Sequence, residues 1–105
     1  MIETSVNSAD LSWEQAENYP DGTMCKTFCK DSSGNPLTML LKLPPGFAMD
    51  EHSHISAEHH YLLEGEYEMK GEIFRAGHYH FIPEHANHGP FRSDTGALLF
   101  VIWES

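Results

Sequence analysis

The sequence predicts an all-β fold, either a small barrel or a sandwich, from two observations. Short runs of apolar or alternating residues recur along the chain, and clusters of glycine, proline, asparagine and aspartate separate them. No window of useful length repeats apolar residues at the spacing of an amphipathic helix. About nine short strands divided by regular turn signals are typical of all-β barrels and sandwiches.

The chain has 105 residues, which is enough for one domain with a single hydrophobic core. Residues 1–21 carry five acidic residues and no lysine or arginine, and they contain few large apolar side chains. We expect them to form an extended N-terminal arm with one short strand around Leu11–Glu14, or else a frayed terminus.

The next predicted strands are Thr23–Lys30 and Leu37–Leu43, separated by a turn whose residue types favour chain reversal. Leu37–Leu43 alternates in a way that is typical of a buried strand. Two prolines and Gly46 end it, and Phe47–His54 is predicted as the following strand.

The second half of the chain continues this pattern. Glu58–Glu64 is predicted as a strand, a hairpin turn is expected at Glu64–Glu66, and Tyr67–Lys70 is expected to pair back. Glycines and a loop then separate the remaining predicted strands, which are Glu72–Ala76, His78–Ile82 and the long closing strand Ala97–Trp103.

Two of these strands, at Tyr61–Leu63 and Leu98–Trp103, are apolar on both faces. A strand of a monomeric barrel needs only one apolar face. The surplus predicts a second buried surface, most simply that of a two-fold homodimer.

Charge and hydropathy exclude several classes of partner. The formal net charge of −10 argues against binding to nucleic-acid backbones and to anionic membranes, both of which require clustered lysine and arginine. The sequence contains no apolar run of about 18 residues, so no membrane span is expected. We therefore expect a small-molecule ligand or substrate as the partner.

The two cysteines indicate the compartment. Cys25 and Cys29 are four residues apart in a predicted strand, which places them about 13 Å apart and too far for a disulfide. The N-terminal residues Met1–Ser5 lack the basic and apolar regions of a signal peptide. A cytoplasmic location is therefore expected.

All eight histidines lie between His52 and His88. His52 and His54 point to the same side of a strand, because side chains alternate with a period of two. Glu58 follows after three residues, enough for a tight bend that brings a carboxylate to the same point, and His88 follows the loop Pro83–Asn87. Three neutral imidazoles and one carboxylate suit a divalent first-row transition-metal ion.

The spacing of these residues resembles the two signature motifs of the cupin superfamily over about residues 44–90, and it includes all four metal-ligand positions. The first motif is matched in the order Gly46, five residues, His52, one residue, His54, three residues, Glu58, six residues and Gly65. The second is matched by Gly77, five residues, Pro83, and His88 five positions on. His85 and His78 depart from the motif at positions that are not ligands, and the segment between the motifs is short for the family.

The resemblance implies that residues 1–105 form a single cupin domain, a small jelly-roll β-barrel. It also implies that one divalent ion is bound by His52, His54, Glu58 and His88, with about two positions left open in an octahedral shell. Fe(II) is favoured, while Mn, Zn and Ni suit the same donors. Related three-histidine cupins leave the carboxylate unbound, so Glu58 remains an open choice.

Other polar residues near the motifs are candidates for lesser roles. His60 has the same parity as Glu58, so it is a candidate catalytic acid–base or substrate-contacting group, or else a packed histidine. Arg92 is a candidate anchor for an anionic substrate or a simple turn residue. The remaining histidines, His59, His78, His80 and His85, are expected at the surface, at the rim or as neighbours that support the ligands without binding the ion.

Three functions follow from the resemblance. Residues 88–91 and 96–101 are similar to small cupins related to diketone-cleaving dioxygenases and to the cupin domain of zinc-binding anti-sigma factors. This favours a metal-dependent, Fe(II)-type dioxygenase acting on a small carbonyl or diketone-like compound. The alternatives are a ligand-sensing cupin without turnover and a sugar or uronate isomerase-type cupin. An apolar cavity would favour ketone oxidation, and a polar one would favour sugars.

Overall fold

A computed structural model describes residues 3–53 and 56–104. Apart from the 3-10 helix η1 (Ser8–Asp10), every regular element within these residues is a strand. The strands in chain order are β1 (Glu14–Gln15), β2 (Met24–Lys30), β3 (Pro36–Leu43), β4 (Phe47–Met49), β5 (His52–Ser53), β6 (Glu58–Met69), β7 (Glu72–Arg75), β8 (Tyr79–Ile82), β9 (Asn87–His88), β10 (Phe91–Ser93) and β11 (Ala97–Trp103). No helix in the described chain is long and apolar enough to cross a membrane.

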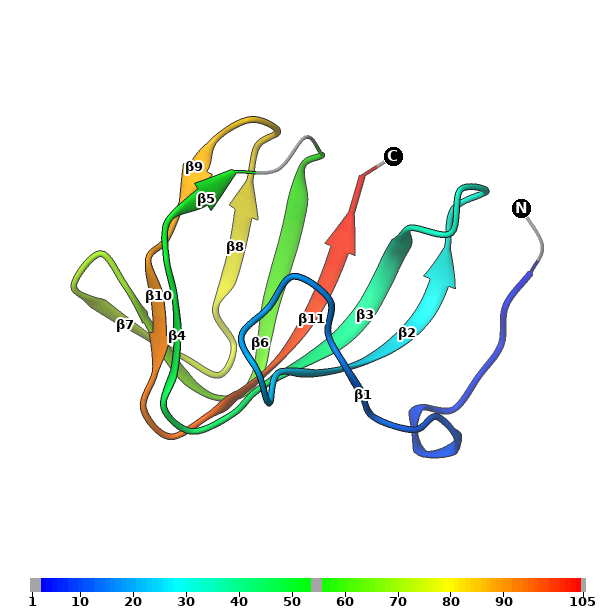
Figure 1. The fold of residues 1–105 in the computed structure, drawn as a ribbon, viewed down its shortest axis with the longest axis horizontal. Helices are drawn as coiled ribbons and strands as arrows, with labels where there is room; N and C mark the ends of the chain where they lie inside the picture. Colours follow the sequence, from blue (N-terminus) through cyan, green and yellow to red (C-terminus); the bar gives the residue numbers. More distant parts are fainter. Residues whose placement is uncertain (1–2, 54–55, 105) are drawn as a thin grey trace.

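The strands form one curled antiparallel sheet and a small two-stranded ladder. The nine-stranded sheet has the order β1-β2-β3-β11-β6-β10-β4, and β7 and β8 also pair with β6. Strands β5 and β9 pair with each other. The sheet curls into a half-barrel, with β4 and β10 facing β2 and β3 across the interior (Figure 1). This confirms the predicted all-β fold and is consistent with a cupin jelly roll.

Strand β6 is continuous, so the hairpin turn predicted at Glu64–Glu66 is wrong. Gly65 has φ +79 and pairs with Ala97 inside the strand. The pairing of β6 with β11 shifts by one residue at Leu63, because Leu99 pairs with Leu62 and Leu98 with Glu64. The chain instead reverses at Lys70–Gly71, where both residues have positive φ, as a type I′ hairpin turn requires. A glycine between two glutamates is also compatible with a bulge, which bends a strand without reversing it.

The bulge changes which residues of β6 face the interior. Before it, Glu58, His60 and Leu62 are buried and alternate with more exposed neighbours. After it, the buried residue is Tyr67, at an odd position. Because one extra residue inverts the alternation of a strand, both halves of β6 send side chains into the same barrel.

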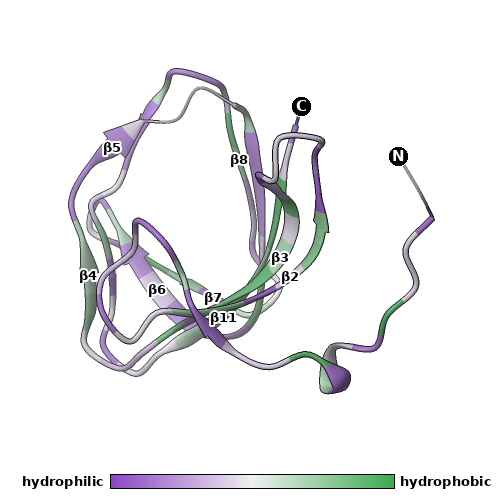
Figure 2. Ribbon diagram, turned by 45° about the vertical axis from the view of Figure 1, so that its right-hand side comes forward, coloured by the Kyte–Doolittle hydropathy of each residue, from purple (hydrophilic) through white to green (hydrophobic). Residues whose placement is uncertain are grey.

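Two other predicted elements differ in their bounds. The strand predicted at Phe47–His54 is divided into β4 and β5, and His54 lies outside the described residues. The strand expected around Leu11–Glu14 is instead β1, which pairs with β2. Residues before it extend away from the barrel (Figure 2).

The core fills the inside of the curled sheet. Its buried members come from most of the strands and from the segment after β1, and they are Ala16, Cys25, Met39, Leu41, Leu43, Phe47, Leu62, Tyr67, Phe91, Ala97, Leu99 and Val101. Tyr19 packs against this cluster, so the chain after β1 belongs to the body of the fold. Trp13 lies under two lysine side chains, with Lys26 Nζ 4.7 Å and Lys42 Nζ 5.4 Å from its ring centroid.

Gly65→Ala is expected to lower the free energy of unfolding by about 3 kcal/mol, because strain at positive φ adds to a steric clash. A Cβ at this position would approach the Gly96 carbonyl oxygen and lie 2.9 Å from the Ala97 Cα. Gly34→Ala is the matched control, since Gly34 also has positive φ but no atom within 4 Å of its added Cβ. It is expected to cost about 1 kcal/mol. Urea denaturation measures both, and equal losses would contradict the bulge argument.

Candidate metal centre and ligand pocket

Three of the four ligands predicted from the sequence come together at one end of the barrel. His52 and His88 are Cα partners in the β5–β9 ladder, and their ring centroids are 4.2 Å apart. Glu58 begins β6 beside them, with its Oε2 3.7 Å from His88 Nε2. The fourth, His54, lies outside the described residues.

Glu58 is the most unusual residue of this cluster, because its carboxylate is 0% exposed. His60 donates a hydrogen bond from Nε2 to Glu58 Oε1 over 3.2 Å. A buried carboxylate is stable only when hydrogen bonds or positive charge compensate for lost hydration. His60 supplies such a hydrogen bond to Oε1, and His88 Nε2 lies 3.7 Å from Oε2, which is within ion-pair distance but long for a hydrogen bond.

The tautomer of His52 is set by the backbone. Its Nδ1 lies 2.9 Å from the carbonyl oxygen of Asp50, which accepts a hydrogen bond and therefore requires the proton on Nδ1. The lone pair of a neutral ring is then on Nε2. Histidines that bind metals usually donate their other N–H to a carbonyl or carboxylate in this way.

The donor set fits a transition-metal ion in its chemistry. Neutral imidazole and carboxylate are ligands that first-row divalent ions accept. Within residues 3–53 and 56–104, however, no group of three or more histidine, cysteine, aspartate or glutamate side chains is arranged to hold an ion. The described donors alone do not form a complete ion site, and the fourth ligand that the sequence predicts, His54, lies outside the described residues.

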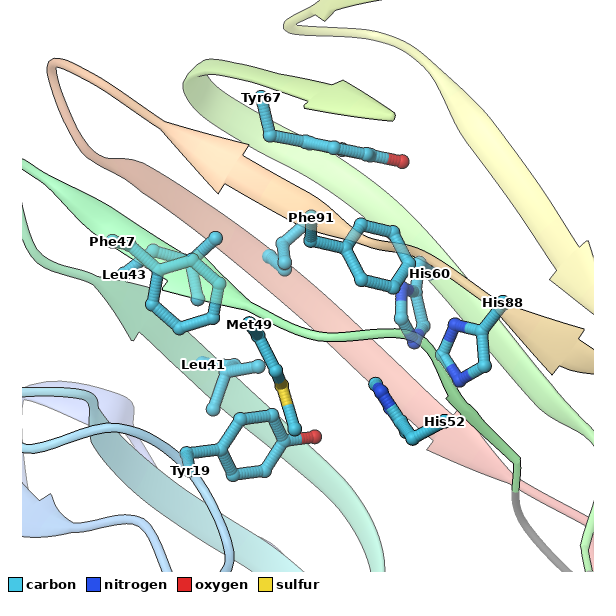
Figure 3. A pocket seen from close by; sticks show the side chains of 11 residues that line it. Tyr19, Leu41, Leu43, Phe47, Met49, His52, His60, Tyr67, His88 and Phe91 are labelled. Carbon is cyan, nitrogen blue, oxygen red and sulfur yellow. The ribbon is translucent and has the colours of Figure 1, made fainter. Parts of the chain in front are cut away.

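A pocket opens beside this cluster, inside the barrel. Its unfilled space is about 370 Å³, part of which is open to solvent. Its lining is mainly hydrocarbon and aromatic, and consists of Tyr19, Leu41, Leu43, Phe47, Met49, His52, His60, Tyr67, His88, Phe91 and Leu99. Figure 3 shows the three histidines grouped together and the leucines, Phe47 and Met49 farther from them.

His60, the candidate catalytic residue, lines this pocket and is buried. It reaches the pocket because it follows Glu58 by two positions in β6, so both side chains are on the inner face. Phe91 packs close to the histidines, with its centroid 5.0 Å from that of His88. The pocket therefore combines an apolar wall with a polar end.

Tyr19 is a pocket residue that the sequence did not indicate. Burial, and then the negative charge of Glu58, raises the pKa of the Tyr19 phenol well above its ordinary value. Tyr19 follows β1 and precedes Pro20, Asp21 and Gly22, a turn-like context without any local sign of a binding site. Only the folding of this segment over the barrel brings the ring to the pocket.

The remaining polar candidates lie elsewhere. His59 lies on the outer face and forms hydrogen bonds with both ring nitrogens. Its Nδ1 is 2.6 Å from Tyr79 Oη, and its Nε2 is 2.8 Å from Glu104 Oε2. His85 is exposed. Arg92 is exposed and paired with Asp94 at 3.3 Å, so it does not line the pocket beside the histidines.

His80 lies opposite His60 in the pairing of β6 and β8, with ring centroids 6.3 Å apart. Burial lowers the pKa of His80 below its ordinary 6.5, and the nearby His60, His78 and Lys70 contribute in the same direction, against Glu58. The neutral form of His80 is therefore favoured in the folded protein.

A curled antiparallel half-barrel with imidazoles and a buried carboxylate at one end of an apolar pocket is the architecture of a cupin. Residues 2–104 match the family model of the ChrR cupin-like domain, so the chain belongs to that family. No curated protein sequence matches this chain.

Solved structures share this fold at low sequence identity. An RmlC-like cupin protein from Ralstonia eutropha JMP134 is 23% identical with a TM-score of 0.81, over 99% of this chain and 70% of that chain. An acetylacetone dioxygenase from Acinetobacter johnsonii is 18% identical with a TM-score of 0.80, over 98% and 74%. The polyketide cyclase RemF from Streptomyces resistomycificus is 17% identical with a TM-score of 0.72, over 97% and 80%. These proteins differ in activity, so the likeness is one of fold.

The lowered pKa of His80 predicts an acid-sensitive stability. Below pH 6.5 the unfolded chain takes up a proton at this residue that the folded chain resists, so stability falls as the pH falls. Substituting His80→Gln in chelator-treated protein is expected to reduce this pH dependence, whereas His85→Gln in the exposed loop is expected to leave it unchanged. Urea denaturation from pH 7.5 to pH 5 measures the slopes, and identical slopes for wild type and His80→Gln would contradict the prediction.

Proposed function

We propose that this cupin binds one divalent transition-metal ion and acts on a small carbonyl or diketone-like compound as an Fe(II)-type dioxygenase. The proposed ligands are the four residues of the two sequence motifs, His52, His54, Glu58 and His88. The observation that carries the proposal is the fully buried Glu58 carboxylate, which lies among imidazoles at the end of an apolar pocket.

The environment of Glu58 supports metal binding over a purely structural role. A buried carboxylate in a structural network is usually neutralised by arginine or lysine. Here two of its partners are imidazoles, and His52 carries its proton on the nitrogen that faces the Asp50 carbonyl. Neutral imidazole nitrogens and carboxylate oxygens are the donor types that a divalent transition-metal ion binds.

When bound, an Fe(II) ion with open coordination positions would supply activation of a bound enolate and of O₂. The chain itself contributes the surroundings. The hydrocarbon walls of the pocket exclude water and orient a small apolar body. His60 holds a proton on Nε2 against Glu58, and we propose it as the residue that holds or moves a proton beside the bound compound.

The lining of the pocket favours a carbonyl compound over a sugar. A sugar site needs several polar side chains to pair with hydroxyl groups, whereas this pocket is mainly leucine, phenylalanine and methionine. The structural likeness to an acetylacetone dioxygenase supports the same substrate class. A sensing cupin without turnover would use the same pocket, and oxygen consumption distinguishes it from an enzyme.

We also propose that the protein is a homodimer. Exposed aromatic and aliphatic side chains gather on the outer face of β6, β8 and β11, where Tyr61 pairs with Tyr79 and His59 with Phe81. Ile102 continues this patch across β11. A chain of net charge −10 associates with its own copy most favourably through such an uncharged face.

The same charge supports a function without nucleic-acid or membrane partners. Cys25 and Cys29 remain thiols, which is compatible with the proposed cytoplasmic location.

Wild-type protein is expected to bind about one divalent ion per chain, with affinity that falls at acidic pH as the ligands take up protons. The double substitution His52→Ala and His54→Ala, and separately His88→Ala, are expected to leave the protein nearly metal-free in elemental analysis. His85→Asn is the matched control, because asparagine tolerates the positive φ of this exposed residue. Full metal content in both ligand variants would disprove the assignment.

Anaerobic loading with Fe(II) followed by oxygen-electrode measurements on a panel of diketones tests the reaction. Wild type is expected to consume oxygen with at least one diketone, and Glu58→Gln is expected to change the rate or metal affinity by about tenfold or more. Metal-loaded wild type that consumes no oxygen with any diketone would favour the sensing alternative.

Light scattering at micromolar concentration is expected to give the mass of a dimer. Tyr61→Lys is expected to shift the equilibrium toward monomer, since it places charge in the proposed interface. Ile73→Lys, at a similarly exposed site on β7, is the control and is expected to leave the mass unchanged. A monomeric wild-type protein would rule out the interface.

A further inference from the structure

The hydroxyl group of Tyr67 is buried without a hydrogen-bond partner. The side chain is 2% exposed, and within the described residues no donor or acceptor pairs with its Oη. Tyr67 also lines the pocket beside the histidines. A buried hydroxyl left unpaired costs about 1–3 kcal/mol, so such a group is usually paired with water or a ligand.

The ring of Tyr67 is held firmly in this position. Its centroid lies 5.8 Å from that of Phe91 and 5.6 Å from that of Phe74, both in tilted or edge contacts. The bulge at Leu63 turns this part of β6 so that an odd-numbered residue faces the interior. The phenol therefore cannot turn toward solvent without loss of packing in the core.

The chemistry of the phenol makes it a donor. Burial raises the pKa of Tyr67 to about 12, so the proton remains on the oxygen at neutral pH. The neighbouring rings of Phe74 and Phe91 provide no acceptor, and within the described residues no histidine of the pocket pairs with the hydroxyl. By contrast, Tyr61 and Tyr79 lie on the outer face of the sheet and do not line this pocket, and Tyr79 Oη is 2.6 Å from His59 Nδ1.

We propose that the Tyr67 hydroxyl is a specificity-determining hydrogen-bond donor to an oxygen of the bound compound. This rests on the proposed function and narrows its substrate class. The compound has a short apolar body and two oxygen acceptors, one placed at the histidine and Glu58 cluster and the other on Tyr67. A small dicarbonyl satisfies both positions, whereas a monoketone leaves one of them unpaired.

The test uses protein loaded with Zn(II), which has no redox chemistry, so that the probe is bound but not oxidised. Calorimetric titration compares acetylacetone with 2-pentanone for wild type, Tyr67→Phe and the exposed control Tyr61→Phe. Tyr67→Phe is expected to weaken acetylacetone binding about tenfold and to change 2-pentanone binding much less. Tyr61→Phe is expected to change neither affinity.

Thermal unfolding separates this role from a structural one. Tyr67→Phe removes an unpaired hydroxyl from the core, so its unfolding temperature is expected to equal or exceed that of wild type. If Tyr67 had only a structural role, Tyr67→Phe would instead lower the unfolding temperature and weaken the binding of both probes equally. Equal acetylacetone affinities for wild type and Tyr67→Phe, or no binding of acetylacetone by wild type, would overturn the proposal.

Metal content measured on the titrated samples distinguishes failure of the proposed Tyr67 donor role from failure of the proposed function. Protein that holds zinc but shows no effect at Tyr67 retains its metal centre and lacks the proposed donor. Protein that holds no zinc contradicts the metal centre, and the two probes are then titrated into it directly. In that case a selective loss of acetylacetone binding in Tyr67→Phe supports the donor role, and its absence overturns it.

Discussion

The burial of the Glu58 carboxylate is the constraint on which the rest of this structure depends. A charged group that is 0% exposed must be compensated, and here His60 and His88 approach its two oxygens at 3.2 and 3.7 Å. His88 comes from β9, so the carboxylate links the long central strand to the small ladder formed by β5 and β9. The polar end of an otherwise apolar barrel is thereby held in one place.

Strand β6 carries both ends of the proposed binding site. Glu58 and His60 lie near its start, and Tyr67 lies beyond the bulge at Leu63. Two residues after the bulge, Gly65 has no side chain where the strand passes close to Gly96. Without the one-residue shift, Tyr67 would face outward and the pocket would lose its buried phenol. A single backbone irregularity thus connects the fold to the proposed substrate class.

The sequence predicted the strands well wherever the signal is local, as in the alternation of Leu37–Leu43 and the apolar run Ala97–Trp103. It misread Gly65, because the contact with Gly96 that favours a bulge is distant along the chain. His52, Glu58 and His88, which the motif spacing predicts as ligands, lie near one another, while His54 lies outside the described residues. The pocket role of Tyr19 was not predictable, since it depends on how the chain after β1 folds over the barrel. The spacing of a motif predicts candidate ligands, but it does not predict the residues that form the walls of the pocket around them.

X-ray absorption spectroscopy of Fe(II)-loaded protein tests the central claim most directly, because it reports the atoms bound to the ion in solution. The account predicts a shell of nitrogen and oxygen only, with the outer scattering characteristic of several imidazole rings and reduced imidazole scattering in His88→Ala. A shell that contains sulfur from Cys25 or Cys29, or one without imidazole scattering, would contradict it.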